Sequence, residues 1–172
     1  MSDSIPPDPL ARGNIRAYAR EPISTDAAAA APAPRPAGNH PNYVTMRGLY
    51  LLQERVAQAQ QRLTALGLTD LERAWAEREL GWLQTRLGSA LLVTRTPRDE
   101  VGFGAIVEVA SEGRTRIWQI VGDDEADAKR GLISWNSPLA RALLGARVGD
   151  TVSWRQPSGD SQLVVLHIEY NL

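Results

Sequence analysis

The sequence predicts an α+β fold in which a helical hairpin precedes a mostly antiparallel sheet that curls around one short helix. Over residues 47–66, apolar side chains recur at alternating spacings of three and four, which is the period of a helix packed along a seam. Residues 104–109, 115–121, 151–156 and 162–170 instead read as strands separated by turns. Helices followed by strands are typical of an α+β protein.

Composition excludes several classes of protein. The 172-residue chain has a net charge of −1, so it is neither a basic nucleic-acid coat nor an acidic mimic. It has no cysteine, which excludes disulfides and thiolate metal sites. No apolar run approaches the ~20 residues of a membrane span, and no secretory signal precedes the first helix. We therefore expect a cytoplasmic, monomeric protein that makes no contact with a membrane.

Residues 1–42 form the first of three predicted segments. They hold eight of the eleven prolines and an unbroken alanine run at 27–31. Few large apolar side chains are present, so burial cannot offset the entropy of ordering the backbone. We predict a disordered tail, and the alternative is a tethered peptide that folds on a partner around residues 15–18.

Residues 43–90 form the predicted hairpin. Gly67 ends the first helix, and Thr69 to Glu72 match a capping box that starts the second, which stops near Gly88. The short linker requires the two helices to run antiparallel, and about 19 residues in each give a length of ~28 Å. The inward positions are expected to be Leu49, Leu52, Val56, Ala59, Leu63 and Leu66 in the first helix, and Leu71, Trp75, Ala76, Leu80, Leu83 and Leu87 in the second.

Residues 91–172 form the predicted sheet domain, whose centre is a short helix. Ser137 is of the N-cap type, Pro138 suits the first helical position, and Gly145 suits the left-handed residue that closes a helix. Strands are expected on either side, at 91–94 and 132–135 as well as those above. Residues 111–114 read as the turn of a β-hairpin.

Several polar and aromatic residues invite a functional interpretation. The acidic loop at 122–127 lacks the alternation of a calcium loop, so we interpret it as a solvated turn. His167 is expected on an outer face with Val165 and Glu169, opposite Leu166, Ile168 and Tyr170. The tryptophans at 118, 135 and 154 either fill the core, which is the commoner fate, or line a ligand groove.

Three runs in the carboxy-terminal half resemble one known family. The runs are VGFGAIVEV, QIVGDDEADAKRGLISWNSPLARALLGARVGD and QPSGDSQLVVLHIEY, within residues 99–170. They are similar in order and spacing to the carboxy-terminal domain of the Gre family of bacterial transcription elongation factors, and NYVTMRGL at 42–49 resembles the segment that opens that family's coiled coil. The resemblance implies an FK506-binding-protein-like (FKBP-like) carboxy-terminal domain and bacterial RNA polymerase as partner, with nucleic acid met only through the polymerase complex.

The same resemblance implies a docking site and a site for metal chemistry. Family members engage the rim of the polymerase secondary channel through the loop that corresponds to Trp135, Asn136, Ser137 and Pro138, where an exposed aromatic and a fixed proline form a preformed contact surface. Acids at the coiled-coil tip help to hold a second magnesium ion at the polymerase active site. We expect no stably bound cofactor in this chain, only a magnesium shared with the polymerase.

The predicted tip departs from the family pattern. Nothing between residues 48 and 92 matches the family's acidic tip motif, and the hairpin is shorter. Asp70 and Glu72 do lie at the tip and have the oxygen ligands that magnesium requires. The helix dipole and the capping box explain both residues structurally, and we favour that explanation.

Three functions remain open at this stage. The favoured one is an accessory factor, not an enzyme, that binds RNA polymerase at its secondary channel and modulates elongation, with cleavage of backtracked RNA as one mode. The second is a channel-binding regulator that does not promote cleavage, either a competitor of Gre factors or a protein similar to nucleoside diphosphate kinase regulators. The third is an FKBP-type peptidyl-prolyl isomerase.

Overall fold

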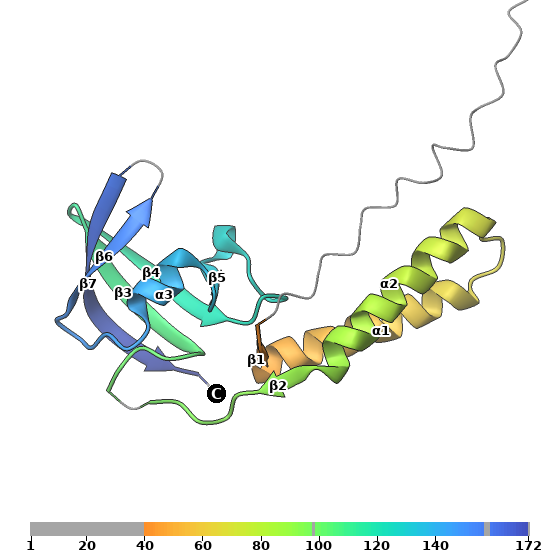
Figure 1. Cartoon of the computed structure of the whole chain (residues 1–172), viewed down its shortest axis with the longest axis horizontal. Coiled ribbons are helices and arrows are strands. Elements are labelled where there is room, and N and C mark those ends of the chain that lie inside the picture. Colours follow the sequence, from red (N-terminus) through yellow and green to blue (C-terminus); the bar gives the residue numbers. More distant parts are fainter. Residues whose placement is uncertain (1–39, 98, 157–158, 172) are drawn as a thin grey trace, which may run out of the picture. The chain divides into compact units, whose positions relative to one another are not determined.

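The computed structural model describes residues 40–97, 99–156 and 159–171. The predicted tail lies outside this range, apart from its last three residues, as does the centre of the turn expected at 157–160. The described elements are two long helices, a pair of short strands and a five-stranded sheet with one short helix (Figure 1). None of the helices in these residues is long and apolar enough to cross a membrane. The mixed α+β class predicted from the sequence is confirmed.

The two long helices are α1, Met46–Thr64, and α2, Asp70–Gly88. They pack against each other along a narrow apolar seam and are joined by a short loop (Figure 1). Thr45 and Thr69 are their N-caps, and the capping box predicted at Thr69 is present. The buried side chains of this seam are Leu52, Ala59, Ala76 and Leu83.

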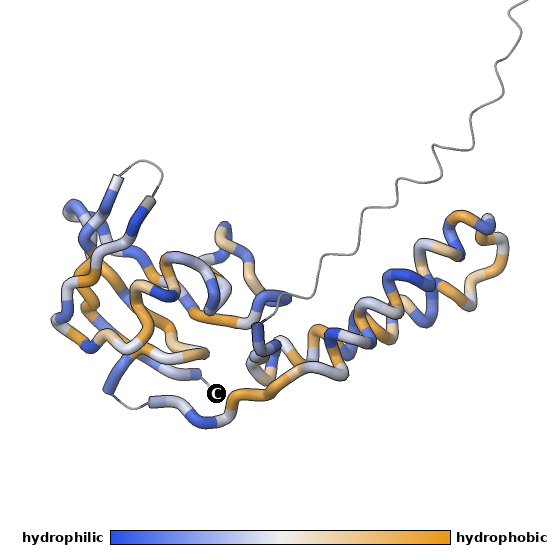
Figure 2. Tube along the Cα trace, in the orientation of Figure 1, coloured by the Kyte–Doolittle hydropathy of each residue, from blue (hydrophilic) through white to orange (hydrophobic). Residues whose placement is uncertain are grey.

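Three of the side chains expected to point inward are exposed. Leu66 is fully exposed because α1 ends at Thr64, which leaves this residue in the loop. Leu71 and Trp75 are 38% and 44% exposed, because no third element covers the end of a two-helix seam. Apolar positions therefore continue into the loop that joins the helices (Figure 2).

A two-stranded parallel sheet closes the base of the helix pair. It consists of β1, Asn42–Val44, and β2, Ala90–Leu92, with Asn42 opposite Ala90. The strand expected at 91–94 is thus shorter, and it pairs here and not with the larger sheet. The sequence before α1 gave no sign of β1, because three residues are too few for a periodic pattern.

The larger sheet has the order β5-β4-β3-β7-β6. Only β4 and β5 are parallel, and the other neighbours are antiparallel, as predicted. The strands are β3, Ala105–Ser111; β4, Arg114–Val121; β5, Leu132–Ser134; β6, Thr151–Gln156; and β7, Gly159–Tyr170. The helix α3, Pro138–Leu143, contributes Leu139, Ala140 and Leu143 to the core beneath the sheet.

The β3–β4 connection is the two-residue hairpin expected at 111–114. Its central residues, Glu112 and Gly113, have φ values of 50° and 74°. Two successive positive φ angles define the turn whose twist matches that of the flanking strands. The hairpin therefore fixes the register in which Ser111 pairs with Arg114.

A β-bulge in β7 overturns part of the prediction for the last strand. Glu108 pairs with His167 but Val109 pairs with Val165, so Leu166 is the extra residue. The bulge moves Val165 into the core and leaves Leu166 43% exposed, the reverse of the simple alternation. His167 lies on the exposed side, as predicted.

The end of β7 is fastened to the segment that precedes β3. The Tyr170 hydroxyl donates to the carbonyl oxygen of Glu100 and accepts from the amide of Gly102, both at 2.7 Å. Burial raises the pKa of the Tyr170 phenol above its ordinary value. This side chain therefore stays a neutral donor and acceptor at physiological pH.

Candidate functional site

The first candidate site is the loop that enters α3. Ser137 caps the helix by accepting from the Ala140 amide at 3.2 Å, and Pro138 occupies the first helical position. The amide of Trp135 donates to Val121 at 2.9 Å and that of Ser137 to Ser134 at 2.9 Å. The four residues predicted as a docking surface thus form one hydrogen-bonded turn.

Within this turn Trp135 is not the exposed aromatic that was expected. The indole is half-buried and packs against the core, where its ring centroid lies 5.1 Å from that of Tyr43. Its Nε1–H is buried without an acceptor among the described residues. Pro138 is the exposed member of the turn, whereas Trp135, Asn136 and Ser137 are partly buried.

The acidic loop after β4 is not a solvated turn. The Asp124 carboxylate forms an ion pair with Arg86 of α2 at 2.8 Å, and the two side chains are only 12% and 8% exposed. Arg86 also donates to Asn42 Oδ1 at 2.6 Å, and the Asn42 amide donates to the Arg86 carbonyl at 2.7 Å. A buried cluster of Asn42, Arg86 and Asp124 therefore joins the base of the helix pair to the sheet domain.

Glu125 of the same loop caps α1 from outside the helix. Its carboxylate accepts from the Thr45 hydroxyl at 2.7 Å and from the Thr45 amide at 3.4 Å. A negative charge at a helix amino terminus is favoured by the helix dipole. A Cβ at Gly48 would meet the Glu125 carboxylate, so a larger residue here would have to displace the side chain that caps the helix.

The second candidate site is the tip between α1 and α2. Glu72 accepts from both the amide and the hydroxyl of Thr69 at 2.8 Å. These two hydrogen bonds lower the pKa of the Glu72 carboxyl. Asp70 is exposed in the first turn of α2. In the part of the chain that the structure describes, these acids meet no third ligand that would complete a group of three for a metal ion.

The capping box predicts how the helix pair responds to acid. Because the folded-state pKa of Glu72 lies below its ordinary value of 4.5, its stabilisation is complete above that value and is lost as the pH falls through the lower one. Glu72→Ala should therefore lower helicity at pH 7 and converge with the wild type in strong acid. Circular dichroism at 222 nm measures this. The exposed Glu77→Ala serves as control, and an equal loss in both variants would contradict the prediction.

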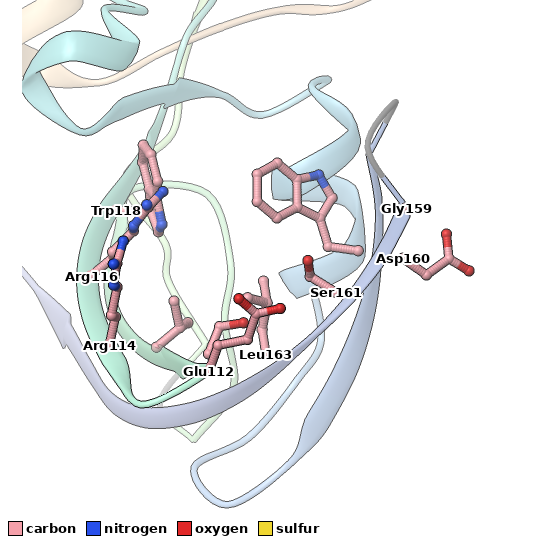
Figure 3. Close-up of a pocket in the computed structure, with 11 residues that line it drawn as sticks. Glu112, Arg114, Arg116, Trp118, Gly159, Asp160, Ser161 and Leu163 are labelled. Carbon is pink, nitrogen blue, oxygen red and sulfur yellow. The ribbon is translucent and has the colours of Figure 1, made fainter.

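A third candidate site is a cleft between β4 and β6. The residues that line it include Trp118, Trp154, Val109 and Leu163, and Figure 3 shows Trp118 and Leu163 beside the hollow. Both indoles also pack against the core. The prediction that these two side chains pack against the core is confirmed; both also line a cleft, and a ligand in it stays a prediction.

Comparisons with known proteins agree on the carboxy-terminal half. Residues 96–170 match the family model described as the carboxy-terminal domain of the transcription elongation factors GreA/GreB. The chain is 38% identical over 104 residues to transcription elongation factor GreA of Thioalkalivibrio sulfidiphilus, covering 58% of this chain and 66% of the relative. It is 43% identical over 97 residues to GreA of Sphingopyxis alaskensis, covering 55% and 61%.

Among solved structures, GreA factor homolog 1 of Thermus thermophilus shares 25% identity, with 76% of this chain and 99% of that one covered and a TM-score of 0.38. The match over residues 96–170 identifies the sheet domain as similar to the GreA/GreB carboxy-terminal domain. Over this domain the chain is similar to the Gre family of transcription elongation factors, as the sequence resemblance implied. The chain spans just under two thirds of the length of the curated relatives it matches.

Sequence reasoning missed the cluster of Asn42, Arg86 and Asp124. The residues that form its hydrogen bonds lie 38 or 44 positions apart in the sequence, so no local sequence pattern predicts that they meet. A usable signal did exist for the cleft. Arg114, Arg116 and Trp118 alternate along one strand, which predicts that their side chains share a face.

Proposed function

We propose that this chain is a Gre-like factor that binds bacterial RNA polymerase at its secondary channel and modulates elongation. The observation that carries the proposal is the match of residues 96–170 to the GreA/GreB carboxy-terminal domain. Relatives that share this domain are named transcription elongation factors. Such factors are accessory to transcription and are not themselves enzymes.

The loop that enters α3 is the proposed contact with polymerase. Pro138 is exposed, while Ser137 and the buried Leu139 hold it in place from either side. A preformed turn loses little conformational entropy when it docks, so more of the contact energy appears as affinity. Trp135 contributes by packing beneath the turn. The backbone amide of Asn136 donates a hydrogen bond to Ser134 Oγ at 3.2 Å, which holds this residue in place.

The tip supports a regulator that does not promote cleavage. Glu72 Oε2 already accepts both hydrogen bonds from Thr69, so a metal bound by that oxygen would compete with the capping box. Leu66 and Trp75 expose apolar surface at the same end, which favours contact with protein over chelation of magnesium. We therefore propose that the helix pair enters the channel without supplying magnesium ligands from Asp70 or Glu72.

We propose the FKBP-like topology for the sheet domain, but isomerase activity is less well supported. A prolyl isomerase twists the X–Pro bond in an apolar, aromatic-lined pocket. The cleft between Trp118 and Trp154 instead carries the charged side chains of Glu112, Arg114 and Arg116. We propose that any activity of the chain operates through polymerase.

A pull-down with RNA polymerase and a transcript-cleavage assay on backtracked complexes test this proposal together. Pro138→Arg places a large charge on the proposed contact at an exposed position, so it should weaken binding at least tenfold and leave the fold intact. Val148→Ala, at an exposed residue outside the α3 entry, should bind like the wild type.

The cleavage assay separates the two modes of action. Binding without stimulated cleavage supports the non-cleaving regulator. Stimulated cleavage that disappears in Asp70→Ala with Glu72→Ala would overturn the structural role given to the tip acids. Absence of polymerase binding by the wild type would reject the proposed function.

A further inference from the structure

The cleft between β4 and β6 carries features that the proposed polymerase docking does not use. Its volume is about 300 Å³, and its walls come from β4 and β6. These strands are separated in the sheet order by β3 and β7, and the curl of the sheet brings Trp118 and Trp154 to one hollow. Val109 and Leu163 give it an apolar floor.

Two arginines extend the Trp118 wall. Arg114, Arg116 and Trp118 occupy alternate positions of β4, so they share one face and their Cα atoms are spaced by about 7 Å. Both arginines are exposed, and neither pairs with a carboxylate among the described residues. Unpaired guanidinium groups beside an aromatic wall form a site for phosphate next to a flat ring.

The acids at the cleft do not neutralise these arginines. Asp160 lines the rim, but its side chain is directed away from the hollow (Figure 3). Glu112 lies between the walls, where its carboxylate can accept from hydroxyl or amino groups of a ligand. The cleft therefore presents aromatic faces, two cations and one acceptor.

We propose that this cleft binds a ribonucleotide, either free or as a residue of single-stranded RNA. The base stacks on the indole of Trp118 or Trp154, the phosphates contact Arg114 and Arg116, and Glu112 accepts from a ribose hydroxyl or an exocyclic amino group. Aromatic platforms beside a basic groove are the means by which proteins hold single-stranded nucleic acid. An extended peptide would instead pair with the backbone of a free strand edge, and it would leave the two arginines without an anionic partner.

Binding is tested with the full-length chain in the absence of polymerase. Fluorescein-labelled hexauridylate reports binding by anisotropy, and uridine monophosphate is the competitor. We expect micromolar affinity that Arg114→Gln with Arg116→Gln weakens at least tenfold. Two phosphate contacts should also give a slope of about −1.4 when the logarithm of the binding constant is plotted against the logarithm of the salt concentration. In the Arg114→Gln, Arg116→Gln double variant this slope should be close to zero.

Arg155→Gln is the matched control for charge. Arg155 follows Trp154 in β6, so it is exposed on the opposite face of the same strand, and its loss should leave affinity unchanged. Trp154→Phe tests stacking and should weaken binding severalfold. Because Trp154 also packs on the core, circular dichroism must first show that Trp154→Phe is folded. If this variant is unfolded, the comparison of the Arg114→Gln, Arg116→Gln double variant with Arg155→Gln still tests the proposal.

The outcomes are distinct. Displacement of the probe by micromolar monophosphate identifies a free nucleotide as the ligand, whereas binding of the hexamer alone identifies RNA. Absence of binding, or an equal loss in Arg155→Gln, overturns the proposal. Since polymerase is absent, failure here leaves the proposed elongation role untouched, and failure of the polymerase pull-down leaves this site untouched.

Discussion

Arg86→Ala is expected to destabilise the protein by about 3–5 kcal/mol, because it leaves a buried carboxylate without its partner. The Asp124 side chain is only 12% exposed and would lose the ion pair at 2.8 Å. Asn42 Oδ1 would lose its donor in the same step. Chemical denaturation followed by circular dichroism measures the free energy of unfolding.

Two controls show whether burial is the cause. Arg62→Ala also breaks an ion pair of the helix pair, with Glu79 at 3.1 Å, but these side chains are 62% and 44% exposed. Its loss should cost less than about 1 kcal/mol. Arg86→Met with Asp124→Leu should be less destabilised than Arg86→Ala, because no charge then remains buried. Equal costs for Arg86→Ala and Arg62→Ala would refute the prediction.

Leu143→Ala is expected to cost about 2–5 kcal/mol, because it opens a cavity in the core beneath the sheet. Leu143 is fully buried against the core cluster. The helix that carries it, α3, has six residues, too few to be stable by itself, so packing must hold it. The loop from Trp135 to Pro138 leads directly into this helix, so polymerase binding should weaken as well.

The neighbouring leucine provides the control. Leu144 is 36% exposed, so Leu144→Ala should change the free energy of unfolding by no more than about 0.5 kcal/mol and leave binding intact. The same denaturation and pull-down experiments compare both variants. If Leu143→Ala and Leu144→Ala lower the free energy of unfolding equally, burial of Leu143 is not what holds α3 against the core.

Elements with local signals were predictable from the sequence. The capping box at Thr69 and Glu72 needs only residues three apart, and Ser137 with Pro138 marks the start of α3 in the same local manner. The turn at Glu112 and Gly113 likewise follows from its length and its glycine. Each of these features was predicted at the correct residues because the interactions that cause it involve only a few consecutive residues.

The candidate sites were predictable only where their causes are local. The loop that enters α3 was located because α3 has clear start signals, but the burial of Trp135 involves Tyr43, which lies far away in the sequence. The bulge at Leu166 depends on the pairing of β7 with β3. Asp124 was expected to be solvated, because nothing near it in the sequence reveals that Arg86 will bury it. Long-range pairing is decided by the whole fold.

The small sheet of β1 and β2 has a consequence for how this architecture can diversify. Because Asn42–Val44 pairs with Ala90–Leu92, the chain enters and leaves the helix pair at one closed point. Equal insertions in α1 and α2 would extend the reach of the tip by ~10 Å for every seven residues added to each helix. Everything beyond the closure would keep its structure. The length of the helix pair is therefore a quantity that evolution or an engineer can vary separately from the sheet domain.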